Sequence, residues 1–421
     1  NPAVAAANKL AMDAGYNYAA NTHAFANTYD VAPSPLEKGV YRSISGNVAT
    51  AWGLLAASEQ SGRPLFCGSY PITPATVILE ELAKHKALGV KTVQAEDEIA
   101  GICTAIGAAF AGNLAVTTTS GPGLSLKSEA MGLAVMTELP LVIVDVQRAG
   151  PSTGIPTKTE QTDLNQALYG RNGECPVVVM AAHSPADCFD AAFNAAKIAV
   201  EHMTPVILLT VAFIANGSAA WKLPDINEYP AIFPPYVTPE MKEGWAPYKR
   251  NPENDVRYWA VPGTPGFMLR IGGLEKSNAT GAISTAPDNH ELMVKLRAEK
   301  VERIADDIPN VEVYGAEDAD PLIVGFGGTY GHLREATDEL NKQGKKAAHA
   351  HFTYINPLPR NTAEVMRRYK KVVVAEQNLG QFAAFLRMKL DGFNPYQYNE
   401  VKGQPFTVAN LVEAFNKIME E

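Results

Sequence analysis

Three short runs of almost purely apolar residues set the strongest limit on how this chain folds. They occupy residues 140–147, 176–181 and 205–211. Such continuous runs are typical of parallel strands that are buried on both faces of a sheet. Further strands are expected at 64–68, 91–95 and 114–119, and the spacing of apolar residues predicts helices at 47–60, 74–86, 98–111, 125–137 and 185–202. This alternation predicts an α/β fold built on a doubly wound parallel sheet.

The rhythm of strands and helices divides the chain into four parts. Residues 1–42 are expected to form an N-terminal helix, at 1–20, and a linker; residues 43–215 hold the doubly wound sheet. Prolines crowd residues 216–310, which predicts an irregular connecting segment that ends in a charged helix near 288–306. Residues 311–421 predict a smaller α/β domain, with strands at 321–326, 346–352 and 371–376 and helices at 330–343, 361–369, 380–390 and 407–420.

Length, composition and charge limit the kinds of core, binding partner and metal site that this chain can have. The chain has 421 residues, of which 46% are hydrophobic, enough for more than one core. A formal net charge of -9 argues against a nucleic-acid surface, and no apolar run is long enough to cross a bilayer. The four cysteines are not spaced as metal or cluster ligands. We therefore expect a cytoplasmic protein with no nucleic-acid or membrane partner and no metal site of its own.

Two polar segments follow predicted strands in the first domain, where open α/β sheets place their ligands. In residues 68–74, Thr73 is expected to cap a helix whose first residue is Pro74. In residues 94–98, three acids are expected in the first turn of a helix rich in Gly and Ala. Capping alone explains both segments, but a carboxylate drawn into an apolar interface can also act on a ring nitrogen.

Two further segments follow the next predicted strands. Residues 118–123 form a turn of small residues that lets a ligand approach the backbone, although the pattern is not a dinucleotide-binding one. Residues 146–158 place Arg148 before a loop dense in Gly, Pro and hydroxyl residues. A lone arginine at a strand end is usually an ion-pair residue, yet a rigidly held guanidinium also suits a substrate carboxylate.

Together these segments resemble the alpha subunit of 2-oxoacid:ferredoxin oxidoreductases, most closely the 2-oxoglutarate type. The resemblance covers residue 43 to the end, and it rests on the order of many motifs. The motifs are Tyr70-Pro71-Ile72-Thr73-Pro74, Glu96-Asp97-Glu98, Thr119-Ser120-Gly121-Pro122-Gly123, Arg148 with Gly150-Pro151-Ser152-Thr153-Gly154, Pro156-Thr157, Glu160-Gln161-Thr162-Asp163-Leu164 and Glu376-Gln377-Asn378-Leu379-Gly380-Gln381.

The resemblance implies a fold and a chemistry. The fold is a pyrimidine-type thiamine diphosphate-binding domain followed by a smaller domain like the C-terminal domain of transketolase. Thiamine diphosphate would be bound between two subunits, a 2-oxoacid decarboxylated, the acyl group passed to coenzyme A and the electrons passed to ferredoxin. Residues 1–20 resemble the tail of a gamma domain fused before the alpha part, which would make this chain one piece of a longer polypeptide.

The resemblance also implies roles for individual residues. Glu98, or failing that Glu96, would hydrogen-bond the aminopyrimidine ring. Thr73 and Arg148 would hold the oxo-acid end of the substrate, and Thr157 would touch its side chain. Charge alone suggests that Lys158 meets a distal carboxylate. The remaining expected cofactor contacts are Tyr70, Pro71, Ile72, Ser120 and Gly121.

Half of the expected active site is missing from the sequence. No Gly-Asp-Gly is followed some two dozen residues later by Asn, the pattern that would hold the diphosphate and Mg²⁺. A beta subunit would therefore bring the Mg²⁺, the diphosphate site and a [4Fe-4S] cluster, in an (alpha-beta)2 heterotetramer. The family leaves the substrate open between 2-oxoglutarate, pyruvate, branched-chain 2-oxoacids and indolepyruvate. A non-catalytic regulatory subunit and a nucleotide-binding protein are two interpretations from different functional classes.

Overall fold

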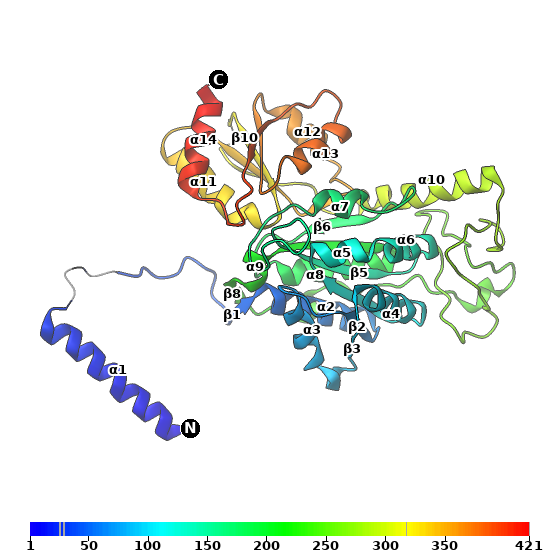
Figure 1. Cartoon of the computed structure of the whole chain (residues 1–421), viewed down its shortest axis with the longest axis horizontal. Helices are drawn as coiled ribbons and strands as arrows, with labels where there is room; N and C mark the ends of the chain where they lie inside the picture. Colours follow the sequence, from blue (N-terminus) through cyan, green and yellow to red (C-terminus); the bar gives the residue numbers. More distant parts are fainter. Residues whose placement is uncertain (25–26, 28–29, 317, 421) are drawn as a thin grey trace. The chain divides into compact units, whose positions relative to one another are not determined.

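The computed structural model describes residues 1–24, 27, 30–316 and 318–420, and it separates into two units (Figure 1). The first unit, residues 1–40, contains the helix α1 (Pro2–Thr22), which confirms the expected helix at 1–20. No residue of α1 is buried. The second unit, residues 41–421, holds all the remaining elements.

A seven-stranded sheet forms the centre of the second unit. Its strands are β2 (Leu65–Ser69), β3 (Lys91–Gln94), β4 (Leu114–Thr119), β5 (Leu141–Gln147), β6 (Val178–Ala181), β7 (Pro205–Val211) and β12 (Tyr354–Asn356). Their order is β12-β6-β7-β5-β4-β2-β3, and every pair is parallel except β12 with β6. The chain moves outward from β2 to β3 and then returns to the other side of β2. This reversal makes the carboxyl ends of β2 and β4 the switch point of the sheet.

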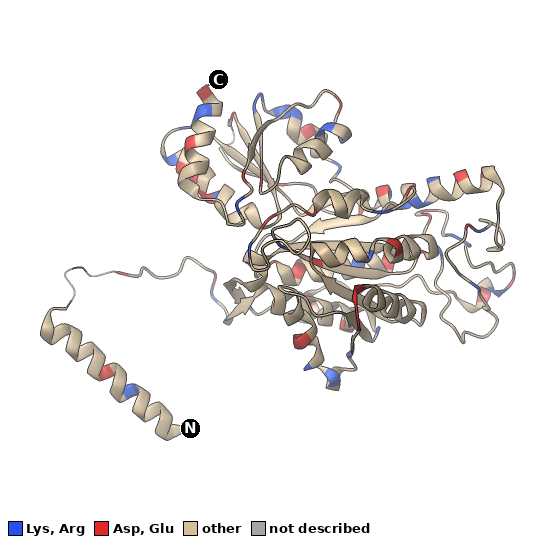
Figure 2. Cartoon of the chain, viewed as in Figure 1, with Lys and Arg blue, Asp and Glu red and all other residues tan. Residues whose placement is uncertain are grey.

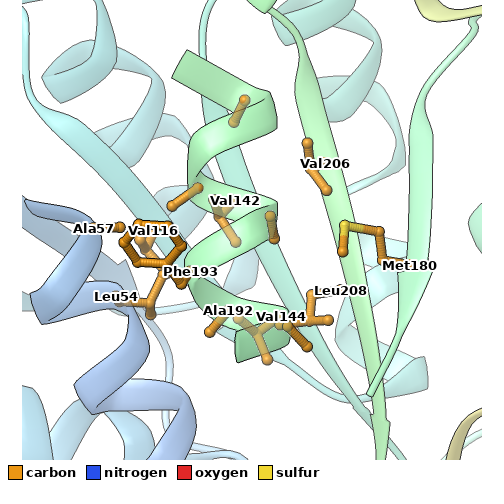
Figure 3. Close-up of a cluster of buried hydrophobic side chains, with 14 of the residues drawn as sticks. Leu54, Ala57, Val116, Val142, Val144, Met180, Ala192, Phe193, Val206 and Leu208 are labelled. Carbon is orange, nitrogen blue, oxygen red and sulfur yellow. The ribbon is translucent and has the colours of Figure 1, made fainter. Parts of the chain in front are cut away.

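Helices cover both faces of this sheet, as a doubly wound fold requires. The helices α2 (Gly46–Ser61), α3 (Thr76–Ala83) and α8 (Cys188–His202) contribute to one apolar cluster. Figure 3 shows part of this cluster, with Val142 and Val144 of β5. The helices α4 (Glu98–Phe110) and α6 (Ser128–Thr137) contribute to a second cluster, which includes Leu141 and Ile143. Alternate residues of β5 therefore face opposite cores, which explains why residues 141–144 are all apolar.

The connecting segment contains more regular structure than expected. The strand β8 (Ser218–Lys222) pairs antiparallel with β1 (Tyr41–Ser45), and neither strand was predicted. Two short helices before this segment, α7 (Leu164–Tyr169) and α9 (Ala212–Asn216), were also missed. The predicted charged helix is confirmed as α10 (Pro287–Arg303), and Figure 2 shows both signs of charge along it.

A second, five-stranded sheet lies in the C-terminal part. Its order is β14-β13-β10-β11-β9, and its strands are β9 (Val313–Gly315), β10 (Leu322–Phe326), β11 (Ala348–Phe352), β13 (Val372–Glu376) and β14 (Tyr396–Asn399). The helices are α11 (Tyr330–Lys342), α12 (Thr362–Arg368), α13 (Gln381–Lys389) and α14 (Val408–Glu420). The three strands and four helices expected here are confirmed. The strands β9, β12 and β14 were not predicted.

Several helix boundaries in the first domain were wrong: the helix expected to end at 86 ends at Ala83, and the helix expected from 185 begins at Cys188. The helix expected from residue 74 begins at Thr76, because a turn at residues 72–75 precedes it. The helix expected at 125–137 is two helices, α5 (Gly121–Leu126) and α6, joined at Lys127. Gly121 and Pro122 look like a turn in the sequence, yet proline fits the first turn of a helix, where its missing N–H is not needed. None of the described helices is both long and apolar enough to cross a bilayer.

Candidate active site

The loops at the switch point are tied to one another. The Ser69 hydroxyl, at the end of β2, donates to the Thr118 carbonyl of β4 at 2.7 Å. Beyond β5, Nη1 of Arg148 donates to the Thr73 carbonyl at 2.7 Å. The carboxyl ends of β2, β4 and β5 therefore present their loops at one edge of the sheet, as the sequence predicts for parallel neighbours.

Thr73 does not cap a helix, which corrects the sequence expectation. The helix α3 is preceded by Ala75 as its N-cap, and the Ile72 carbonyl accepts bonds from the amides of Ala75 at 2.7 Å and Thr76 at 3.0 Å. Because this turn satisfies the first amides, the Thr73 side chain is not needed as a cap. Thr73 is exposed, and its carbonyl anchors the buried Arg148.

The three acids before α4 lie in different environments. Asp97 is the N-cap, and its Oδ1 accepts from the Ala100 amide at 2.7 Å. Glu98 is the first helical residue and is only 7% exposed, whereas Glu96 is exposed. Only Glu98 therefore lies within the first turn, and only Glu98 is drawn into the interior.

Small residues of α5 leave space for the Glu98 side chain. A Cβ atom added at Gly123 would overlap the Thr119 hydroxyl and lie 2.8 Å from Glu98 Cγ and 3.1 Å from Glu98 Oε1. A Cβ at Gly121 would lie 2.5 and 2.6 Å from the two carboxyl oxygens of Asp163. Both glycines are therefore required by packing as the chain is folded here.

The same edge carries polar atoms that lack a partner. Ser120 is fully buried, and its hydroxyl makes no hydrogen bond, as is also true of Nε of Arg148. Buried polar atoms without partners are rare and need an explanation. The unpartnered Ser120 hydroxyl and the buried Glu98 carboxylate are polar groups of the kind that can bond a nitrogen-containing ring such as an aminopyrimidine.

Two buried aspartates interact near this edge: Asp163, which belongs to the motif at residues 160–164, and Asp145, which the sequence did not single out. Burial raises the pKa of Asp145 well above its usual range, and the charge of Asp163 adds to this; neither carboxyl oxygen of Asp145 has a hydrogen-bond partner. Burial, and then the charge of Glu160, raises the pKa of Asp163 to about 7, while Arg148 opposes the shift. An acid within the apolar run 140–147 is the signal that could have found Asp145.

The loop after Arg148 is held as a narrow turn. The Ala149 amide donates to the Lys158 carbonyl at 3.0 Å, and the Ile155 amide donates to the Ala149 carbonyl at 2.9 Å. Gly154 has a φ of +47°, where a side chain would collide with the Ala149 carbonyl. Thr157 and Lys158 are exposed on this loop.

The remaining expected contacts lie on the loop after β2 and at the start of α5. Tyr70 is exposed, whereas Pro71 and Ile72 are half-buried and Gly121 is buried. Across the described ranges, no three His, Cys, Asp or Glu side chains are grouped as metal ligands.

Comparison with known proteins identifies the family. Residues 59–279 match the family described as pyruvate flavodoxin/ferredoxin oxidoreductase, thiamine diphosphate-binding. The chain is 55% identical to the 2-oxoglutarate oxidoreductase subunit KorA of Mycobacterium tuberculosis, over 92% of this chain and 59% of the relative. It is 34% identical to the 2-oxoglutarate synthase subunit KorA of Methanothermobacter marburgensis, over 80% of this chain and 88% of the relative.

Solved structures agree with this match. The 2-oxoglutarate:ferredoxin oxidoreductase from Magnetococcus marinus, solved with 2-oxoglutarate, coenzyme A and succinyl-CoA bound, superposes with a TM-score of 0.87 at 35% identity, over 93% of this chain and 67% of that one. A split-gene transketolase, at 14% identity and a TM-score of 0.51, shares the fold alone. The chain spans 59% of the Mycobacterium tuberculosis relative, and it belongs to the 2-oxoacid:ferredoxin oxidoreductase family, in the part that holds the thiamine diphosphate-binding domain.

Proposed function

We propose that this chain acts as the alpha part of a thiamine diphosphate-dependent 2-oxoacid:ferredoxin oxidoreductase. The reaction is the oxidative decarboxylation of 2-oxoglutarate with coenzyme A, with electrons passed to ferredoxin, in either direction. The observation that carries the proposal is the burial of Glu98 against Gly123, beside loops tied together by Arg148 and Thr73. The substrates named for the relatives and for the Magnetococcus marinus structure support the choice of 2-oxoglutarate.

Each residue has a task in this proposal. Thiamine diphosphate, when bound, supplies the carbon nucleophile and stores the electrons left by decarboxylation. Glu98 holds a proton at a pyrimidine ring nitrogen. Because its carboxylate is buried, it shares this proton with the ring in preference to water. Ser120 and Gly121 lie against the ring, and Tyr70, Pro71 and Ile72 form the wall on the side of β2.

The substrate end of the site uses the loops after β2 and β5. Arg148 presents its guanidinium to the substrate carboxylate, and the bond to the Thr73 carbonyl fixes its orientation. The Thr73 hydroxyl holds the oxo group. Thr157 and Lys158, exposed on the narrow loop, reach the side chain and distal carboxylate of 2-oxoglutarate. Pyruvate, branched-chain 2-oxoacids and indolepyruvate lack that second carboxylate, so this pairing favours 2-oxoglutarate over them.

The proposal includes a partner. A beta subunit brings the diphosphate site, Mg²⁺ and a [4Fe-4S] cluster, and the assembly is an (alpha-beta)2 heterotetramer.

Residues 43–215 form the pyrimidine-binding domain, 216–310 the connecting segment and 311–421 the transketolase-like domain. A cytoplasmic location is also proposed, because all four cysteines are free, as is usual where thiols stay reduced.

A substrate panel tests the proposal. The full natural polypeptide is purified with its partner subunit, and reduction of a viologen dye is followed with coenzyme A and each of the four classes of 2-oxoacid. We expect the highest kcat/KM with 2-oxoglutarate. Higher kcat/KM with pyruvate or indolepyruvate would reject the substrate, and no turnover with any 2-oxoacid would reject an enzymatic role in favour of a regulatory one.

A further inference from the structure

Lys127 lies at the junction between α5 and α6, with its side chain fully buried. The backbone hydrogen bonds continue through this junction: the Lys127 amide donates to the Gly123 carbonyl at 3.1 Å, and the Met131 amide donates to the Lys127 carbonyl at 2.9 Å. The side chain crosses to the next helix, where Nζ donates to the backbone carbonyl of Glu98 at 2.8 Å.

A buried lysine at this position is expensive. Removing an ammonium group from water costs several kcal/mol unless charges and hydrogen bonds offset the loss, and an apolar side chain would fill the same space without that cost. The titratable groups that face Lys127 are Glu98 and Cys103 of α4, Asp97 at the N-cap of α4, and Cys67 of β2. Burial lowers the pKa of Lys127 to about 8, and the charge of Glu98 is the largest effect opposing the shift.

Lys127 and Gly123 contact Glu98 from the same side. They are four residues apart in a nearly continuous helical run, so they share one face of it. Gly123 borders the carboxylate side chain of Glu98, and Lys127 bonds its backbone carbonyl. The first residue of α4 is therefore fixed at two points by a single turn of the α5–α6 run.

We infer that Lys127 is a positioning residue for Glu98, which holds the first turn of α4 in place and supplies a positive charge behind the carboxylate. The inference rests on the proposed role of Glu98. Lys127 does not itself contact substrate. It acts by keeping Glu98 at a fixed distance from the ring that the site is proposed to bind, with a positive charge nearby.

Two substitutions separate the parts of this role. Lys127→Met removes both the charge and the hydrogen-bond donor, and Lys127→Gln removes the charge but keeps a donor. Lys276→Met is the matched control, because Lys276 is also buried, bonds the backbone carbonyls of Gly272 and Leu274, and has a pKa lowered by burial to about 8. This control measures how much kcat and stability are lost when a buried lysine that does not contact Glu98 is removed.

The variants are assembled with the partner subunit, and kcat, KM and the pH profile are measured with 2-oxoglutarate. We expect both Lys127 variants to lower kcat at least about tenfold and to change KM little. The low-pH limb of the profile should move to higher pH, because the site loses a buried positive charge. Lys276→Met should change neither kcat nor the limb.

Three outcomes contradict the inference or its basis. An unchanged low-pH limb in both Lys127 variants, with any loss explained by a lower Tm like that of Lys276→Met, would overturn the positioning role. A wild-type profile for Lys127→Gln alone would overturn the role of the charge. A wild-type complex that oxidises no 2-oxoacid would contradict the proposed function itself, which distinguishes that failure from the others.

Discussion

Adding one methyl group at Gly123 should displace the proposed acid. In Gly123→Ala the new Cβ would lie 2.8 Å from Glu98 Cγ, whereas an ordinary contact between carbon atoms is about 3.5–4.0 Å. Glu98 must therefore withdraw by about 1 Å, and the Thr119 hydroxyl must also rotate away. A misplacement of about 1 Å at a catalytic group can lower the rate about a hundredfold. We expect kcat to fall by about that factor.

The control is an alanine substitution at Gly132, a glycine with free space around it, assayed for kcat in the same way. Gly132 lies in α6, and nothing is found within 4 Å of a Cβ added there. Gly132→Ala should keep wild-type kcat and gain about 0.5–1 kcal/mol of stability, because alanine favours the helix. Gly123→Ala should instead lose about 1–3 kcal/mol of stability through overpacking, measured by denaturant unfolding.

The kcat values of the two alanine variants together decide whether the contact between Gly123 and Glu98 affects activity. If Gly123→Ala retains wild-type kcat in the assembled enzyme, the contact between Gly123 and Glu98 has no bearing on activity and the proposed packing constraint is refuted. If both alanine variants lose kcat equally, the loss reflects the helices in general and not the position of Glu98.

Three further substitutions test other parts of the molecule. Arg148→Lys should lower kcat and raise KM for every 2-oxoacid, because an ammonium group cannot bond the Thr73 carbonyl and grip a carboxylate as a fork. Lys158→Met should raise KM for 2-oxoglutarate by up to roughly fivefold, as for one exposed ion pair, and leave KM for pyruvate unchanged. Glu138→Gln should lower the free energy of unfolding by about 3–5 kcal/mol, because Arg250 and Lys300 would be left buried without their anion. Burial opposes the ionisation of Glu138, but these two cations hold its pKa well below the usual range. The stability that the ionised carboxylate contributes is therefore present above pH about 4.5 and is lost as pH falls through the folded pKa. The free energy of unfolding in urea, measured from pH 7 to pH 3, should depend less on pH in the variant.

The sequence was most informative where one physical requirement dominates. The buried strands β5 and β7 were predicted closely, because a strand with helices on both faces is mostly apolar. The order of motifs placed the loops after β2, β4 and β5 at one edge, since parallel strands end on the same side. Burial favours Glu98 over Glu96, which the sequence left open.

The missed features depend on contacts between distant residues. The strand β8 pairs with β1 although the two lie far apart in the chain, and β12 joins a sheet whose other strands come much earlier. Thr73 looks like a helix cap, but the turn at residues 72–75 satisfies the helix amides first. Lys127 looks like a surface residue of a helix, and only the packing of α4 against α5 reveals its burial.

The exchange rate of the C2 hydrogen of thiamine diphosphate tests the central claim most directly. The assembled enzyme, its Glu98→Gln variant and its Glu96→Gln variant are mixed with D₂O, quenched in acid and analysed by NMR. We predict that Glu98→Gln slows exchange by about 10²–10⁴-fold, as expected for loss of an acid–base group, and that Glu96→Gln exchanges like the wild type. Wild-type exchange in Glu98→Gln, or a large loss in Glu96→Gln, would contradict the assignment of the buried carboxylate.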